Sequence, residues 1–176
     1  MVYIIKIHVD GGCRANGQPD SIAGAAAAFK NESGKYHGET KEALPSSPRP
    51  TNQQAEIISI ILGLEKALER YDQLTSNPWL DVTIYSDSRY AVDCMTKWVY
   101  KWSNNGWTNS EGNKVANRDL IMEAVDLDDR LKEKGDVHYV WIPREENQYV
   151  DKLCNDLMDD MCMCGDRQSS SSDSSW

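Results

Sequence analysis

The sequence predicts an α/β fold in which helices flank a five-stranded mixed β-sheet. Residues 2–10 alternate apolar and polar side chains, which is the period-two pattern of a strand with one buried face. Apolar residues between positions 52 and 70 recur at helical spacing instead. Three strand patterns precede this helix, and strands alternate with helices after it. That order favours parallel strands joined by crossovers, with helices packed on the faces of one sheet.

The first strand is expected to end at Gly11 and Gly12. Small apolar residues from Ala23 to Phe29 form the second strand, and a turn rich in polar residues and glycine leads to the third at residues 35–40. A proline-rich loop follows. Thr51 and Gln54 then fit a capping box, in which each side chain satisfies a free backbone N–H at the start of the helix over 52–70.

The rest of the chain continues the alternation of strands and helices. Strands are expected at 82–86 and 137–142, and helices at 120–131 and 146–163. Between the fourth strand and the first of these helices, Ala91, Met95, Trp98 and Trp102 recur at the spacing of one further helix. We expect one catalytic domain over residues 1–163, followed by a serine-rich, disordered tail over 164–176.

Composition limits the classes of protein to consider. The chain has 176 residues, a length typical of one domain, and no apolar run long enough to span a membrane. Its net charge of −9 argues against a general polyanion binder, although residues 97–118 hold four basic residues and one acid. Five scattered cysteines indicate a reducing compartment. We expect a monomer without a membrane partner, located in the cytoplasm or nucleus and not secreted.

Four carboxylates stand near the ends of predicted elements. Asp10 and Asp87 follow strands, whereas Glu56 and Asp151 lie in the first turns of helices. Ligands of open α/β sheets bind beyond the carboxyl ends of strands, so these acids are candidates for one site. Converging carboxylates repel one another unless a cation neutralises them, and Mg²⁺ or Mn²⁺ prefers such oxygen ligands. The alternative is that they are solvated surface acids, which are common in an acidic chain.

The residues around these acids resemble the four motifs of the cellular type 1 ribonucleases H, in their order and their spacing. Segment 9–17 (Val-Asp-Gly-Gly-Cys-Arg-Ala-Asn-Gly) resembles the first motif, and segment 51–56 (Thr-Asn-Gln-Gln-Ala-Glu) the second. Segments 85–88 and 147–151 resemble the third and fourth. The similarity covers residues 2–160, so the resemblance implies a ribonuclease H-like fold.

The resemblance also implies an activity. The family cuts the RNA strand of RNA–DNA hybrids with two divalent ions, Mg²⁺ or in its place Mn²⁺, and leaves 5′-phosphate and 3′-hydroxyl ends. Carried over to this chain, Asp10, Glu56, Asp87 and Asp151 become the catalytic metal ligands, with Asp10 bridging both ions. The attacking hydroxide would come from water, so no serine or cysteine nucleophile is needed.

Further positions resemble the contacts of the family to its substrate. The RNA strand, recognised by its 2′-hydroxyl groups, would meet the backbone at 12–15, and Arg49, Thr51 and Asn117 would form a pocket for a DNA phosphate. Residues 98–117 resemble the basic protrusion that grips the DNA strand. The substrate contacts implied in this way are Gly12, Cys13, Arg14, Asn16, Arg49, Thr51, Asn52, Gln53, Trp98, Trp102, Ser110 and Asn117.

The sequence departs from the family pattern at two places. The paired lysines common in the protrusion are Ser103 and Asn104 here, which should weaken hybrid binding and its salt dependence. Many members also carry a histidine in a glycine-rich loop before the last aspartate. The segment Arg144–Asp151 lacks both, and resembles a branch of the family without this histidine loop. Arg144 is a possible auxiliary residue, and we expect slower turnover.

Other functions stay open at this point. A hybrid-binding protein without catalytic activity could share the fold, although a complete set of buried acids would then cost stability. A related carboxylate exonuclease would have a second acid at position 12, which is glycine. An interaction module that uses the serine-rich tail, or a detached reverse-transcriptase domain, are further alternatives.

Overall fold

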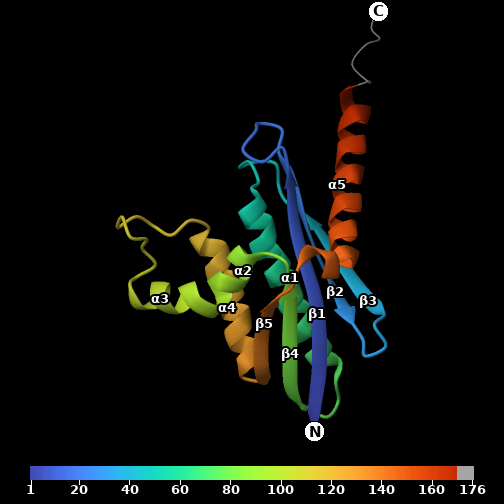
Figure 1. The fold of residues 1–176 in the computed structure, drawn as a ribbon, viewed down its shortest axis with the longest axis vertical. Coiled ribbons are helices and arrows are strands. Elements are labelled where there is room, and N and C mark those ends of the chain that lie inside the picture. The colour runs from blue at the N-terminus through green and yellow to red at the C-terminus, as the bar shows by residue number, and fades with distance from the viewer. Residues whose placement is uncertain (170–176) are drawn as a thin grey trace, which may run out of the picture.

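A computed structural model describes the backbone of residues 1–169 and the side chains of residues 1–164. Five strands form one sheet in the order β3-β2-β1-β4-β5 (Figure 1). Antiparallel pairing joins β1 (Val2–Arg14), β2 (Ile22–Lys30) and β3 (Tyr36–Ala43). Parallel pairing joins β1 to β4 (Trp79–Ser86) and β4 to β5 (Gly135–Trp141). The predicted five-stranded mixed sheet is confirmed.

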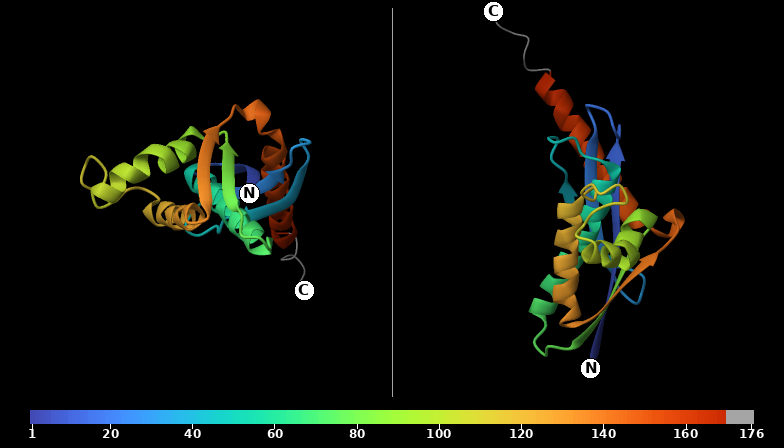
Figure 2. Two further views of the ribbon diagram at one scale, coloured as in Figure 1. Left: turned by 90° about the horizontal axis from the view of Figure 1, so that it is seen from below. Right: turned by 90° about the vertical axis from the view of Figure 1, so that its left-hand side faces the viewer.

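Helices cover both faces of this sheet (Figure 2). The helices α1 (Asn52–Gln73) and α4 (Arg118–Lys132) pack on one face, where Gly63 of α1 brings the helix close to Val9 and Ile84. The helix α5 (Gln148–Ser169) crosses the opposite face, where Cys154 and Met158 pack on Ala26. Along β1, therefore, Val9 faces α1, whereas its neighbour Asp10 faces α5.

Several elements are longer than expected. The first strand continues past Gly11 and Gly12 to Arg14, because β2 supplies antiparallel partners along this whole stretch. The parallel partner β4, in contrast, ends at Ser86. The last helix, α5, runs to Ser169 and so includes the first residues of the predicted tail; residues 170–176 lie outside the described part of the chain. No described helix is long and apolar enough to cross a lipid bilayer.

The segment after β4 is not one regular helix. It consists of α2 (Arg89–Asp93), a π-helical turn η1 (Cys94–Trp98) and α3 (Val99–Asn104). Such π turns insert an extra residue and change which side chains face the core. Figure 1 shows α3 and the loop that follows it projecting away from the sheet before the chain returns in α4. This projecting part, residues 99–117, is called the protrusion below.

Candidate active site

Asp10 and Asp87 are brought together by the unequal lengths of two neighbouring strands. The register pairs His8 with Tyr85, so Asp10 lies level with the residue that follows the end of β4. That residue is Asp87. The prediction that Asp10 stands at the end of its own strand is therefore wrong, since β1 continues to Arg14. It lies instead beside the point at which the parallel partner of β1 ends. Asp10 and Asp87 therefore line the same cavity.

Gly11 allows the third acid to approach. A Cβ atom on Gly11 would lie 2.2 Å from the carbonyl carbon and oxygen of Ala55, so only glycine permits this contact between β1 and α1. The contact places the first turns of α1 beside the strand. Glu56, the residue after Ala55, is thereby held next to the end of β4.

Asp151 is positioned by a buried asparagine. Asn147 is fully buried, its side-chain amide donates to the carbonyl of Val9 (2.9 Å), and its own carbonyl accepts from the N–H of Asp151 (3.2 Å). The Asn147 side-chain oxygen lies 3.1 Å from Nδ1 of His8, which is also buried. The first turn of α5 is thus tied to the two residues of β1 that precede Asp10.

The four acids meet at one cavity of about 500 Å³. Asp10 is 8% exposed, and its burial, with the neighbouring charges of Asp87 and Asp151, raises its pKa to about 9. Burial also raises the pKa of Glu56. Hydrogen bonds from Ser88 and Asn52 stabilise the charged form of Glu56 and so oppose this rise. Negative charge is therefore unfavourable at this point of the fold unless a cation accompanies it.

Two of the acids are restrained by neighbouring polar groups. Glu56 accepts hydrogen bonds from the Asn52 amide (2.8 Å) and from the Ser88 hydroxyl (2.7 Å), one on each carboxylate oxygen. Asp151 lies 3.2 Å from the guanidinium of Arg144. No group of three or more His, Cys, Asp or Glu side chains among the described residues is already arranged around a metal position.

The donor set nevertheless suits hard divalent cations. All four side chains offer carboxylate oxygens to one cavity, and Mg²⁺ and Mn²⁺ prefer oxygen ligands. The raised pKa of Asp10 marks a position where a positive charge would be stabilising.

The glycine-rich end of β1 lies at the rim of this cavity. Gly12, Cys13 and Arg14 line it together with Asn52. The Arg14 side chain is directed toward α5, where it pairs with Asp159 at 2.7 Å and donates to the carbonyl of Asn155 at 3.2 Å. Only the backbone of Arg14 is therefore placed for the predicted substrate contact.

Four of the predicted substrate contacts lie at or beside the start of α1. Asn16 accepts from the N–H of Asn52 at 3.3 Å, so these two predicted contacts adjoin, and Gln53 is exposed beside them. Thr51 caps α1, and the predicted capping box with Gln54 is present.

The three members of the predicted phosphate pocket have separate partners. Arg49 donates to the carbonyl of Gly17 at 3.5 Å, and Asn117 donates to the Tyr90 hydroxyl at 3.2 Å. No hydrogen bond among the described residues joins Arg49 or Thr51 to Asn117.

The protrusion carries a row of aromatic rings. Trp98 lies at its base, with its ring centroid 6.0 Å from Tyr90 and 5.8 Å from Trp102, and Trp102 lies 6.0 Å from Trp107. Trp98 is 37% exposed, and Trp102 is partly buried. Ser110 is exposed at the tip of the loop. These residues lie outside the carboxylate cavity, on a separate part of the surface.

Several residues of the site were not found from the sequence. Ser88, which caps α2 and holds Glu56, directly follows Asp87 and could have been identified as a helix cap. Trp141 lines the cavity, donates its indole N–H to the carbonyl of Asp87 (3.1 Å), and lies 3.9 Å beneath the Arg89 guanidinium. His8 looked like an ordinary strand residue, and no local pattern indicates its contact 139 residues away.

Known proteins with related sequences are consistent with this geometry. The RNase H family profile matches residues 4–158. The chain is 28% identical to ribonuclease HI of Haemophilus ducreyi over 156 residues, which is 87% of this chain and 86% of the relative. It is 31% identical to ribonuclease H of Hydrogenovibrio crunogenus over 161 residues, or 89% of this chain and 97% of the relative.

Solved structures give the same result. The N-terminal RNase H domain of a Mycobacterium tuberculosis protein superposes with a TM-score of 0.64 and 27% identity, covering 92% of this chain and 98% of that domain. LC11-RNase H1, solved in complex with an RNA/DNA hybrid, gives a TM-score of 0.61 and 25% identity, covering 86% of this chain and 94% of that one. By sequence over most of its length and by its fold, this chain belongs to the ribonuclease H family.

Proposed function

We propose that this chain is an endonuclease that hydrolyses the RNA strand of RNA–DNA hybrids and uses two divalent ions, Mg²⁺ or alternatively Mn²⁺. One observation carries the proposal: four carboxylates from β1, α1, the end of β4 and α5 line one cavity, and Asp10 among them is buried. The family membership and a structural relative solved with an RNA/DNA hybrid support the choice of substrate.

In this proposal Asp10, Glu56, Asp87 and Asp151 would hold the ions. The bound ions would activate a water molecule and stabilise the leaving oxygen of the phosphodiester. The side chains of Asn52 and Ser88 orient Glu56, and Asn147 fixes the distance between Asp151 and β1. No protein nucleophile is required, since water would attack phosphorus while the bond to the 3′-oxygen breaks, which would leave 5′-phosphate and 3′-hydroxyl ends.

Substrate positioning follows from the surfaces around the cavity. The backbone of Gly12 to Arg14 lines the cavity and, with Asn16 and Gln53, would contact the 2′-hydroxyl groups of the RNA strand. The DNA strand would extend toward Trp98 at the base of the protrusion and toward Trp102 and Ser110 within it, where an aromatic ring packed on a sugar or base contributes about 1–3 kcal/mol.

Arg144 has a supporting role in this proposal. Its guanidinium lies 3.2 Å from Asp151 and lines the same cavity, so it can attract the substrate phosphate and restrain the Asp151 carboxylate. A guanidinium stays charged at neutral pH, so it cannot shuttle a proton as a histidine does. Turnover should accordingly be slower than in relatives with the histidine loop.

A substrate panel tests the proposal. An end-labelled RNA–DNA hybrid, single-stranded RNA, double-stranded RNA and double-stranded DNA of one sequence are incubated with the protein and Mg²⁺ or Mn²⁺. We expect cleavage of the RNA strand of the hybrid alone, with products that a ligase can join without prior phosphorylation. Cleavage of single-stranded RNA at a similar rate would contradict the proposed substrate.

A further inference from the structure

One edge of β1 has no strand partner at the end of the sheet opposite the carboxylates. β4 pairs with β1 from Val2 to His8, whereas β2 pairs with it only from Ile7 onward. Within the part of the chain that the structure describes, residues 2–6 therefore have no strand on the β2 side. Figure 1 shows β1 running past the end of the β2–β3 hairpin toward the N-terminus. We call residues 2–6 the free edge.

A cavity of about 370 Å³ lies along the free edge. It is lined by all five residues of the edge, by the end of β2 and the start of its turn (residues 29–32), and by His37 and Arg70. Val2 and Ile4 are 58% and 56% exposed, which is unusual for apolar strand residues. Unpaired backbone N–H and C=O groups beside exposed apolar side chains form a ready template for an added strand.

The charges around this cavity are mostly positive, although the chain as a whole carries −9. Lys6, Lys30 and Arg70 line it, with Glu32 as the only acid. None of these three cations takes part in an ion pair among the described residues. Arg70 is also held in place, because its Nε and Nη2 both donate to the Tyr3 hydroxyl, at 3.0 and 2.8 Å.

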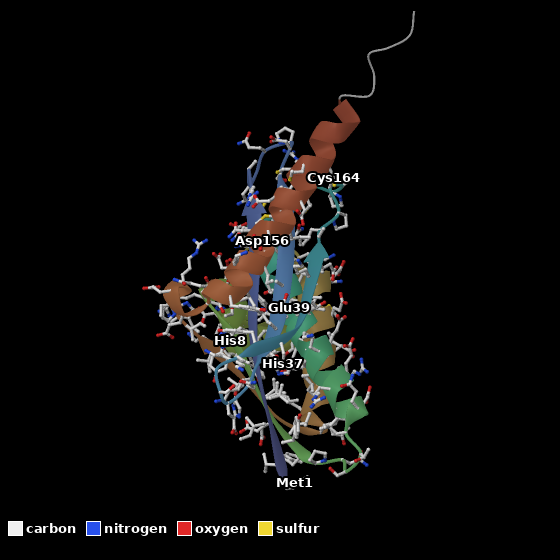
Figure 3. All side chains as sticks on the ribbon, turned by 90° about the vertical axis from the view of Figure 1, so that its right-hand side faces the viewer. Met1, His8, His37, Glu39, Asp156 and Cys164 are labelled. Carbon is white, nitrogen blue, oxygen red and sulfur yellow. The ribbon has the colours of Figure 1, made fainter. Side chains whose placement is uncertain are left out.

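The two faces of the free edge differ in chemistry. Tyr3 and Ile5 face α1, and Arg70 lies on that side. Ile4 and Lys6 face the opposite side, which Figure 3 shows without a covering helix between His8 and Met1. Side chains of an added strand would alternate between these faces in the same way. Lys30 lies on the same side as Lys6, because it lies over the ring of Tyr36, which packs on His8. Acidic side chains on this side, and apolar side chains on the side of Tyr3 and Ile5, would therefore complement the edge.

We propose that the free edge binds an extended peptide that alternates acidic and apolar residues and adds to the sheet as a sixth strand beside β1. A second copy of this chain is a poorer occupant, because it would place Lys6, Lys30 and Arg70 against the same cations. Nucleic acid could neutralise the cations but offers no strand to the backbone groups. The proposal is independent of the nuclease function, since the free edge lies at the other end of β1 from Asp10.

A labelled probe peptide, Glu-Val-Glu-Ile-Glu-Val, tests the proposal on the full chain. We expect saturable binding by fluorescence anisotropy, weakening with salt, and NMR shifts concentrated on the amides of residues 2–6. The same peptide N-methylated at alternate amides should not bind, because it cannot pair with the edge. Equal binding of the methylated peptide, shifts located elsewhere, or no binding at all would overturn the proposal.

Charge reversal supplies the matched comparison. The variant Lys6→Glu/Lys30→Glu should bind the probe at least about tenfold more weakly, which corresponds to the loss of two favourable charge pairs. The control Lys35→Glu/Lys41→Glu, also exposed, should bind as the unchanged protein does. Hybrid cleavage should be the same in all three proteins. An acidic peptide would be contradicted as the occupant if both variants lost probe binding equally. It would also be contradicted if duplex nucleic acid displaced the probe, or if the protein associated with itself through the free edge.

Discussion

Asp10 is the residue whose environment departs most from that of an ordinary surface acid. Folding raises its pKa from 3.8 to about 9, chiefly through burial, so the fold stabilises the protonated form. This contribution to stability is fully present below about pH 4 and is lost as the pH rises toward 9. Without divalent ions, the protein should therefore become less stable over this range of pH.

Asp10→Asn should remove this pH dependence, because the amide resembles the protonated acid. At pH 8 without divalent ions, we expect the variant to be more stable by at least about 1 kcal/mol, since one unit of pKa corresponds to about 1.4 kcal/mol. Thermal unfolding measures the difference. Added Mg²⁺ should stabilise only the unchanged protein, because ligands stabilise the state that binds them. An Asn variant that is less stable at pH 8, or equally stabilised by Mg²⁺, would contradict this explanation.

Asn147 is predicted to be essential for the placement of Asp151. Asn147→Ala leaves the Val9 carbonyl and the His8 ring without partners in a buried place, which should cost about 2–3 kcal/mol. Urea unfolding measures the loss, and Gln148→Ala, exposed and next in sequence, should cost less than about 0.5 kcal/mol. Similar losses in the two variants would show that the buried contacts of Asn147 are not important.

Buried contacts between distant residues, such as those of Asn147, could not be predicted from the sequence. The four acids could be predicted because they stand in motifs whose neighbours resemble a known family. The His8–Asn147 contact joins residues 139 positions apart, and neither residue stands in a pattern that indicates a partner. Ser88 and Trp141 hold acids of the site through single hydrogen bonds, which leave no periodic signal in the sequence.

Among the elements, the long helix α1 was predicted almost completely, because its capping box and its apolar spacing agree. The segment after β4 was not, since the apolar spacing of Ala91, Met95, Trp98 and Trp102 fits a continuous helix. The π turn at Cys94–Trp98 interrupts it. One extra residue in a turn barely alters the spacing of side chains, so the sequence pattern does not reveal it.

The protrusion gives a prediction about salt dependence. Replacing Ser103 and Asn104 by lysine should tighten hybrid binding and steepen its dependence on salt by about one unit of slope for each new phosphate contact. A titration of hybrid binding between low and moderate salt measures the slope. Glu32→Lys in the exposed β2–β3 turn changes the net charge by the same two units elsewhere and should leave the slope unchanged. A steeper slope in that control would mean that net charge, and not the protrusion, determines binding.

The connection between β5 and α5 gives a prediction about turnover. It is short, consisting of Ile142, Pro143, the turn η2 (Arg144–Glu146) and Asn147. Inserting a glycine-rich loop with a histidine before Asn147 should raise kcat and leave KM nearly unchanged, because the histidine would assist proton transfer. The same loop with alanine is the control. An equal gain from both loops would indicate that flexibility, and not the imidazole, limits the rate.

For the molecule as a whole, the architecture was predictable because each pattern is consistent with one topology. Three strands that precede the first helix form the antiparallel part of the sheet, and the later alternation gives its parallel part. The relative lengths of the strands were not predictable. Strand β1 extends beyond β4 at one end and beyond β2 at the other, and these overhangs depend on pairing between distant segments of the chain. These two overhangs place Asp10 in the cavity and leave the free edge open.

The most direct test of the account compares the unchanged protein with Asp10→Asn in single-turnover cleavage of an RNA–DNA hybrid, with hybrid binding measured on the same samples. We predict cleavage that requires Mg²⁺ or Mn²⁺ and falls at least about a thousandfold in the variant, while hybrid binding is retained. Cleavage by the variant at an undiminished rate would contradict a site built on the four carboxylates. Hybrid binding without cleavage by the unchanged protein, in either metal, would instead identify a binding protein that has kept the fold.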